Sequence, residues 1–547
     1  MTRILLSSVF GPYGVDDAYG RKENVMELFH NQVTREQGMF SLRFHHPSFG
    51  LHLLAANIDA DVTVLDFPSQ QRFVEEIRKG YDYVGLSFIA PNVVKAQRMA
   101  ELIRAHAPAS KIVLGGHGTR IPDIAQRVDA DHICSGEGVR WLRQLLGEDP
   151  DRPIRHPTIK SALSKRILGL PRPVEAAVLI PGVGCPNACR FCATSHFFDR
   201  AYTAYLPTGE ALLEACLQVE AELGLHEFFI MDENFLKYRE RAERFVELLE
   251  QHGKRYRFNI FSSAETIREV GIDFMVRMGV EFLWLGVESK HEIYEKNRGV
   301  DFHALIAELR DHGITVLASG ILFLEHHDRE TLQQDVDFMV SLNADLVQFM
   351  QLGPMPQTAL YKKVRDEGVL LDDVPYEERH GQDRIWFKHP HFERDETKDL
   401  LRQAFERDYQ INGPSLLRLF ETTARGALRI PGDDDVARRA REAFARRCVE
   451  YRPVLRWMRR FAPTPRAADQ ARHVEEMYAE VLGPETVRDR ALSMAALPFV
   501  IREWFNARTG RNMYQPPTVV TSYPQPLPAK RRLAVGNMVP ATASIGS

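Results

Sequence analysis

The chain has 547 residues, 44% of them hydrophobic and 26% charged, which is the composition of an ordinary globular protein of about three or four domains. Its 70 basic and 74 acidic residues give a net charge of -4, so no global field attracts nucleic acid, and no nucleic-acid partner is expected. The six cysteines do not resemble a secreted disulfide framework and no apolar run approaches the roughly 20 residues of a membrane span, so we expect a cytoplasmic protein.

Residues 1–148 are predicted to form a doubly wound, flavodoxin-like α/β domain. Five β-rich runs alternate there with stretches of helical periodicity. These runs are RILLSSVF (3–10), VTVLDF (62–67), YVGLSFI (83–89), KIVLGG (111–116) and DHICSGEG (131–138). Ligands of such sheets bind beyond the carboxyl ends of the strands, so the turns that follow the strands become candidate binding residues.

A second βα series is predicted over residues 173–370. The segment 149–172 before it is rich in proline and basic residues, has no clear period and is expected to be a linker. Six strands follow: AAVLIPG (176–182), HEFFIMDENF (226–235), RFNIFSSAE (257–265), EFLWLGVES (281–289), ITVLASGILFL (314–324) and LVQFMQLGP (346–354). Six such units predict a partial (β/α)6 barrel, whose site lies at the carboxyl ends of its strands.

The remainder of the chain lacks strand patterns. Residues 371–512 are expected to form a separate α-helical C-terminal domain, because only helical periodicity is found there. Residues 513–547 are rich in Pro, Ser, Ala and Thr and cannot bury enough apolar surface to offset the entropy of ordering. We therefore expect a disordered tail.

Three cysteines stand in C-x-x-x-C-x-x-C spacing directly after the first strand of the six-unit series. Thiolates at Cys185, Cys189 and Cys192 can bind three corners of a 4Fe-4S cluster and leave the fourth iron open. The alternative is a structural zinc site in which His196 supplies the fourth ligand.

This loop, with an aromatic residue just before its last cysteine, resembles the cluster motif of the radical S-adenosylmethionine (SAM) enzymes. The resemblance implies that SAM chelates the open iron and is split, with one electron, to a 5'-deoxyadenosyl radical that abstracts hydrogen from a substrate. It also implies an external electron donor such as a flavodoxin or ferredoxin. By the same resemblance, the SAM contacts are Phe191, Asp232, Glu233, Asn234, Ser262, Glu265, Gly286 and Glu288.

The N-terminal unit resembles the cobalamin-binding domain that precedes many radical SAM barrels. The matching sequences are PSFGLHLLAA near residue 50, the serine of GLSFI, the glycines of VLGGHGTR and the SGEG turn. By this resemblance, the cobalamin contacts are Asp17, Tyr19, Ser87, Gly115, Gly116, Gly136 and Glu137. The cobalt-binding motif D-x-H-x-x-G is absent, so a histidine ligand to cobalt is not expected. A nucleotide, a flavin or a docking function remain alternatives for this fold.

Together these resemblances predict a cobalamin-dependent radical SAM enzyme that methylates an unactivated carbon. A cyclase or ring-rearranging enzyme with the same cofactors is the alternative, and a redox- or cobalamin-sensing binding protein is a further one. The substrate is unidentified. Arginines and aromatic residues at 452–463 and 497–505 favour an apolar or lipid-like substrate and peripheral membrane contact, although both stretches also fit ordinary helix packing.

Overall fold

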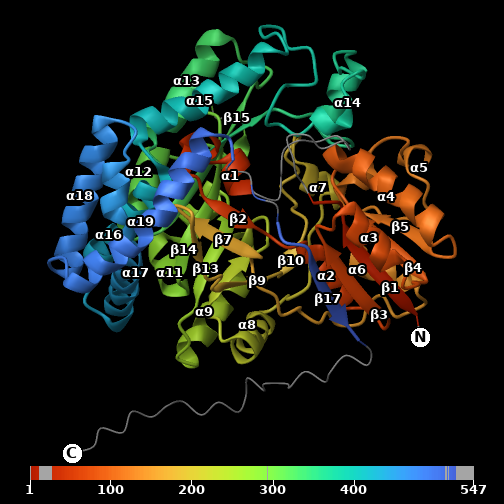
Figure 1. Ribbon diagram of the computed structural model, residues 1–547, viewed down its shortest axis with the longest axis horizontal. Helices are drawn as coiled ribbons and strands as arrows, with labels where there is room; N and C mark the ends of the chain where they lie inside the picture. Colours follow the sequence, from red (N-terminus) through yellow and green to blue (C-terminus); the bar gives the residue numbers. More distant parts are fainter. Residues whose placement is uncertain (1, 12–27, 292–293, 512–513, 515, 525–547) are drawn as a thin grey trace, which may run out of the picture.

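The computed structural model describes residues 2–11, 28–291, 294–511, 514 and 516–524 (Figure 1). Its N-terminal part contains a six-stranded sheet of order β17-β3-β1-β4-β5-β6. The strands are β1 (Arg3–Ser8), β3 (Asp61–Asp66), β4 (Tyr83–Ser87), β5 (Lys111–Gly115), β6 (His132–Ile133) and β17 (Val519–Tyr523). The five strands predicted for this domain are confirmed, and they pair in parallel.

Helices cover both faces of this sheet, which explains why its strands are almost continuously apolar. Neighbouring residues of β1 belong to different cores: Leu5 packs with residues of α3 and α4, and Leu6 packs with residues of α2 and α6. The helices are α2 (Phe49–Ala55), α3 (Gln70–Ile77), α4 (Val93–His106), α5 (Ile124–Arg127) and α6 (Gly138–Leu145).

The expectation of a wholly disordered tail is wrong for residues 519–523. These residues form β17, which pairs antiparallel with the edge strand β3 and is seen beside it in Figure 1. The Tyr523 hydroxyl lies 2.9 Å from His52 Nδ1, and Thr518 donates to the Phe67 carbonyl. The composition of the tail does not predict this strand. Pairing with the exposed edge of β3 supplies backbone hydrogen bonds without requiring a large apolar side-chain area. Residues 525–547 lie outside the described residues.

The second large sheet is the predicted barrel. Its order is β16-β15-β14-β13-β12-β9, all parallel, so the six predicted strands are confirmed in chain order. The strands are β9 (Ala176–Leu179), β12 (Glu227–Ile230), β13 (Arg257–Ser262), β14 (Val280–Glu288), β15 (Thr315–Leu322) and β16 (Leu346–Gln351). The connecting helices are α8 (Gly209–Leu223), α9 (Arg239–Gln251), α10 (Ala264–Val270), α11 (Ile272–Met278), α12 (Phe302–Asp311), α13 (Arg329–Ser341) and α14 (Ala359–Asp366).

The segment predicted as a linker contains two strands. β7 (Ser164–Ile167) and β8 (Leu170–Arg172) join β2 (Arg43–His45) in a small antiparallel sheet. The Ser161 amide donates to the Ala176 carbonyl at 2.8 Å, which connects this segment to β9, an edge strand of the barrel. The segment is therefore part of the folded unit between the two α/β domains.

Five long helices complete the described chain: α15 (Glu396–Asn412), α16 (Ser415–Arg429), α17 (Asp435–Arg460), α18 (Pro465–Leu482) and α19 (Val487–Arg508). The predicted helical character is confirmed, but the helices do not stand apart. Leu317 and Leu346 of the barrel share a hydrophobic core with α16 to α19. The fully buried Arg418 donates to Asp408 at 2.6 Å and to the Ala344 carbonyl at 2.6 Å. α16 is largely buried because it packs against α12 of the barrel as well as against α17 and α18.

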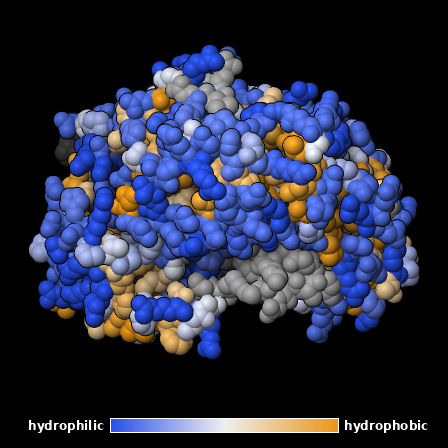
Figure 2. All heavy atoms as spheres, turned by 90° about the horizontal axis from the view of Figure 1, so that it is seen from above, coloured by the Kyte–Doolittle hydropathy of each residue, from blue (hydrophilic) through white to orange (hydrophobic). Residues whose placement is uncertain are grey.

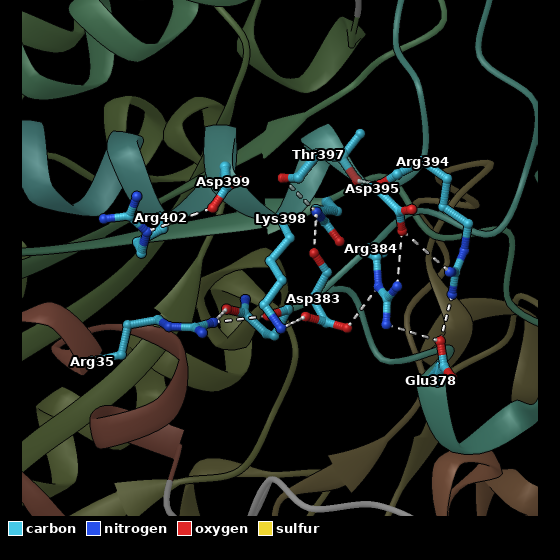
Figure 3. Close-up of polar contacts among 12 residues, drawn as sticks. Arg35, Glu378, Asp383, Arg384, Arg394, Asp395, Thr397, Lys398, Asp399 and Arg402 are labelled. Atoms are coloured by element: carbon cyan, nitrogen blue, oxygen red, sulfur yellow. Dashed lines mark hydrogen bonds and ion pairs between the residues drawn. The ribbon is translucent and has the colours of Figure 1, made fainter. Parts of the chain in front are cut away.

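A polar network joins the segment after the barrel to α15 and to the N-terminal region (Figure 3). Asp383 accepts from Lys398 at 2.7 Å, and Arg384 bridges to Asp395 at 2.9 Å. Arg35 donates to the Gln382 carbonyl at 2.8 Å. These contacts connect segments far apart in the chain.

The face seen in Figure 2 is mainly hydrophilic, in keeping with the balanced charge of the chain. Among the described helices, none has the length and apolar character needed to cross a bilayer.

Candidate functional site

Each of the two parallel sheets has a cavity near the carboxyl ends of its strands. A short helix lies between the two cavities. α7 (Ala193–Phe197) follows the three-cysteine loop, and Cys192 caps its first turn by accepting from the Ser195 amide at 3.5 Å. The Ser195 hydroxyl donates to the Cys185 carbonyl at 2.7 Å. These bonds fix the loop that presents the thiols.

The first cavity, of about 190 Å³, holds all three predicted cluster ligands. Its lining residues come from the ends of successive barrel strands and from the cysteine loop: Cys185, Asn187, Cys189, Phe191, Cys192, Ser195, Glu233, Asn234, Phe261, Ser262, Ser263, Trp284, Gly286, Glu288, Lys296 and Ser319. Burial raises the pKa of the Cys192 thiol to about 11, and it also raises the pKa values of Cys185 and Cys189. Metal binding to these thiols must therefore release protons.

The histidine of the zinc alternative does not line this cavity. His196 Nδ1 lies 3.0 Å from the Cys192 carbonyl, and its Nε2 accepts from the Ala359 amide at 3.3 Å. Both ring nitrogens are thus used within the protein in one neutral tautomer. With three cysteines and no histidine among the described residues that line the cavity, the donor set fits a 4Fe-4S cluster with one open iron better than a closed Cys3His zinc site.

Glu233 is the acidic group most open to the cavity. Its side chain is exposed to the hollow but has protein around it, and this desolvation together with the neighbouring Asp232 raises the pKa of its carboxyl to about 7. The next residue, Asn234, bonds to Ser262 at 3.0 Å and to Ser263 at 3.1 Å. The ends of β12 and β13 are therefore held together at the cavity.

Two of the residues predicted to contact SAM lie elsewhere. Asp232 is buried and is paired with Arg241 at 2.8 Å, and it accepts from the Tyr202 hydroxyl at 2.6 Å. Glu265 lies in the first turn of α10 and does not line the cavity. The strand-end rule located turns that line the cysteine cavity, but only the folded backbone decides which side chain of a turn points inward.

Several residues that line the cavity were not predicted from the sequence, among them Lys296, Ser319 and the aromatic pair Phe261 and Trp284. Lys296 pairs with Glu288 at 2.6 Å, and although burial opposes this, Glu288 raises the pKa of the lysine. Phe261 and Trp284 stack with ring centroids 5.1 Å apart. Strand periodicity would have placed both aromatic side chains inside the barrel, but no sequence pattern pointed to Lys296.

The second cavity, of about 220 Å³, lies along the α2 and α6 face of the N-terminal sheet and is mostly apolar. It is lined by five of the seven predicted cobalamin contacts, namely Ser87, Gly115, Gly116, Gly136 and Glu137. The other two, Asp17 and Tyr19, lie outside the described residues. Glu137 also caps α6 and accepts a hydrogen bond from Tyr205 of the second unit.

Glycines give this cavity its shape. A Cβ at Gly115 would meet no atom within 4 Å, so the missing side chain leaves space in the slot itself. Gly116 has φ +84°, and a Cβ there would lie 2.6 Å from the Phe88 carbonyl oxygen. Close backbone approach without side chains is what a slot for a nucleotide tail requires, so the residues fit cobalamin.

α7 forms part of the wall of both cavities. Cys192 and Ser195 line the cysteine cavity, whereas Phe197 and Phe198 line the N-terminal slot. His117 of the slot stacks on Phe197 with centroids 4.3 Å apart. The two candidate cofactor sites are therefore adjacent, with one turn of helix between them.

Two family profiles match the chain in agreement with this geometry. The radical SAM superfamily matches residues 179–339, and the B12 binding domain matches residues 38–146.

Among curated proteins, the chain is 24% identical over 421 residues to the hopanoid C-2 methylase of Rhodopseudomonas palustris, covering 70% of this chain and 76% of the methylase. It is 23% identical over 358 residues to the anaerobic magnesium-protoporphyrin IX monomethyl ester cyclase of Cereibacter sphaeroides, covering 57% of this chain and 58% of the cyclase. The match thus spans less than two thirds of the cyclase.

Among solved structures, the radical S-adenosylmethionine methyltransferase TsrM from Kitasatospora setae, with cobalamin and a 4Fe-4S cluster bound, superposes with a TM-score of 0.52 at 14% identity. The superposition covers 81% of this chain and all of TsrM, and it shows a common fold. The cofactors of the family are a 4Fe-4S cluster, SAM and cobalamin. The two matched domains, the adjacent cavities and the shared fold place this chain in the family of radical SAM enzymes that contain a cobalamin-binding domain.

Proposed function

We propose that this radical SAM enzyme is a C-methyltransferase that transfers a methyl group to an unactivated carbon. The observation that carries the proposal is the placement of the cysteine cavity and the cobalamin slot on the two sides of α7. A methyl transfer needs both sites to face one substrate. Similarity to a hopanoid C-2 methylase and to TsrM supports the same reaction class.

When bound, the cofactors supply a carbon-centred radical at the cluster and a transferable methyl group at cobalamin. The protein supplies the enclosure. Phe261 and Trp284 close the barrel below the cysteine cavity, and Phe197 and Phe198 enclose the slot side. These apolar walls exclude water and stray hydrogen donors, which would otherwise intercept a radical.

Ring closure is the second candidate, because the cyclase of Cereibacter sphaeroides also matches this chain. The test uses protein loaded anaerobically with cluster and cobalamin, a strong reductant, SAM carrying a CD3 methyl group, and a lipid and small-molecule extract. Methylation predicts S-adenosylhomocysteine and 5'-deoxyadenosine in comparable amounts and a CD3 group on one extract component by mass spectrometry.

Deoxyadenosine formed without label transfer would contradict methylation and favour ring chemistry. Binding of SAM without any consumption would instead indicate a sensor.

The substrate class and the partners are also part of this proposal. A lipid-like substrate is supported by the hopanoid methylase. α19 adds a surface argument: Val487, Met494, Ile501 and Phe505 are 48–84% exposed and lie on the side of the helix opposite its buried residues. Trp457 is buried instead and donates to the Ser493 carbonyl, so peripheral membrane contact would involve α19 rather than the 452–463 stretch. An external electron donor is part of the proposal.

The pH dependence of SAM binding offers a test of Glu233. Its carboxyl has a pKa of about 7, above the ordinary value of 4.5, so it holds a proton below that pH and attracts the SAM ammonium only above it. A group with pKa 7 is about tenfold more ionised at pH 8 than at pH 6. We expect SAM affinity to weaken by up to about tenfold as the pH falls from 8 to 6. Anaerobic equilibrium dialysis measures this affinity.

The pH dependence of SAM affinity should disappear in Glu233→Gln. It should persist in Glu265→Gln, because the Glu265 side chain lies outside the cavity. If Glu233→Gln keeps the wild-type pH dependence, another group controls how SAM binding varies with pH.

A further inference from the structure

A third cavity lies inside the barrel, at the end opposite the cysteines. It has a volume of about 170 Å³. We call this third cavity the lower chamber. Arg257 and Asn259 of β13 line it, and Phe261 of the same strand lines the cysteine cavity. The residues between these three are fully buried. The side chains that face the barrel interior are thus only partly buried, which means that the lumen is hollow rather than packed, unlike the filled core of a typical barrel.

An aromatic layer separates the lower chamber from the cysteine cavity. His46, Phe229, Phe261 and Trp284 follow one another across the lumen, with successive ring centroids 5.9, 5.7 and 5.1 Å apart. Phe229 faces the lower chamber, whereas Phe261 and Trp284 face the cysteines. None of the residues that the structure describes lines both cavities, so the chamber is a compartment of its own.

Most charges of the lower chamber are neutralised within the protein. Arg447 pairs with Glu227 at 2.9 Å and with Glu281 at 2.7 Å, and Arg257 pairs with Glu227 at 3.3 Å. Across the chamber, Arg172 lies 3.7 Å from Glu450. These two groups carry three arginines and three glutamates, so their charges sum to zero.

Lys165 of β7 is the exception. Among the described residues its ammonium has no hydrogen bond and no carboxylate within 4.0 Å, and its Nζ lies over the Phe44 ring, 5.7 Å from the centroid. Glu175 also lines the chamber but is an exposed residue and forms no ion pair with Lys165. Burial lowers the pKa of Lys165, as expected for an ammonium whose hydration has not been replaced.

We propose that the lower chamber binds an organic carboxylate with a flat apolar body, whose carboxylate pairs with Lys165 and whose body packs on the aromatic walls. Phe44, Phe229 and Phe282 line the chamber and offer ring faces and edges for such a body. The anion supplies the partner that Lys165 lacks, and one negative charge matches it because the three arginines of the chamber are already paired with glutamates. This site takes no part in the proposed methyl transfer.

The test is isothermal titration calorimetry on the full chain loaded with cluster and cobalamin, in the presence of saturating SAM. The probes are 2-naphthoate, the neutral 2-naphthamide and the cationic 2-naphthylmethylamine. We expect saturable binding of 2-naphthoate, with the amide at least roughly tenfold weaker and the amine weaker still, because a charge-assisted hydrogen bond in an enclosed site is worth about that factor.

Lys165→Met should weaken 2-naphthoate binding at least roughly tenfold and remove the preference for the anion, whereas Lys165→Arg should keep that preference. Lys160→Met is the matched control, since Lys160 is exposed on the same segment and lies outside the chamber. Equal affinity for carboxylate and amide in the wild type, absence of saturable binding, or unchanged 2-naphthoate affinity in Lys165→Met would each overturn the proposal. The wild-type comparison decides even if Lys165→Met does not fold.

Discussion

Alanine in place of Cys185, Cys189 or Cys192 is expected to abolish the cluster and, with it, all cleavage of SAM. Each thiol lines the cysteine cavity and is one of the three cluster ligands that the cysteine spacing predicts. The three side chains are half-buried in a loop and belong to no hydrophobic core cluster, so the variants should keep the wild-type unfolding temperature within about 3 °C. Iron content after anaerobic reconstitution and 5'-deoxyadenosine formation are the measurements.

Cys216→Ala and Cys448→Ala are the matched controls. Both side chains are fully buried in core clusters and neither lines the cysteine cavity, and their burial raises the pKa of each thiol. They should lose a little stability but retain full iron content. Loss of iron in either control, or retention of a SAM-cleaving cluster in any of the three loop variants, would show that the ligand assignment is incomplete.

Leucine at Gly115 is expected to prevent cobalamin binding while leaving the iron–sulfur cluster in place. Gly115 ends β5 and faces the slot, and a Cβ there meets no protein atom within 4 Å. The added side chain therefore starts in open space inside the slot, and it occupies volume that the ligand needs. We expect at least a roughly tenfold loss of cobalamin affinity, read from the visible spectrum after gel filtration.

Two further variants separate filling of the slot from damage to the fold. Gly115→Ala adds one methyl group and should retain most of the cobalamin. Gly116→Ala should destabilise the domain itself, because its Cβ would lie 2.6 Å from the Phe88 carbonyl oxygen at a φ of +84°. If Gly115→Leu binds cobalamin normally with unchanged stability, the slot lies elsewhere.

The barrel and the N-terminal sheet were predictable because burial on both faces makes their strands read as short apolar runs separated by helical periods. The cysteine ligands were predictable for a different reason: three ligands of one metal cluster within eight residues form a local pattern. Glycines such as Gly115 and Gly116 were accessible through the resemblance of their turn to a cobalamin domain, and the structure places both at the slot.

Contacts between distant segments were not accessible in this way. β17 forms only because β3 presents an open edge, and the two strands are separated by more than 450 residues. The exclusion of Asp232 from the cysteine cavity depends on Arg241 of α9, which captures its carboxylate. Lys296 reaches Glu288 from a segment without any pattern.

The sequence by itself determined the two α/β units and their order and predicted the three cluster ligands, because hydrophobic periodicity and ligand spacing are local properties of a chain. Only the tertiary structure decided that α7 stands between the two candidate cofactor sites, that the C-terminal helices share a core with the barrel, and that Lys165 faces a hollow lumen with no carboxylate partner among the described residues. Each of these depends on which side chains meet across long separations in the chain, and that is fixed by packing and charge pairing in the folded state.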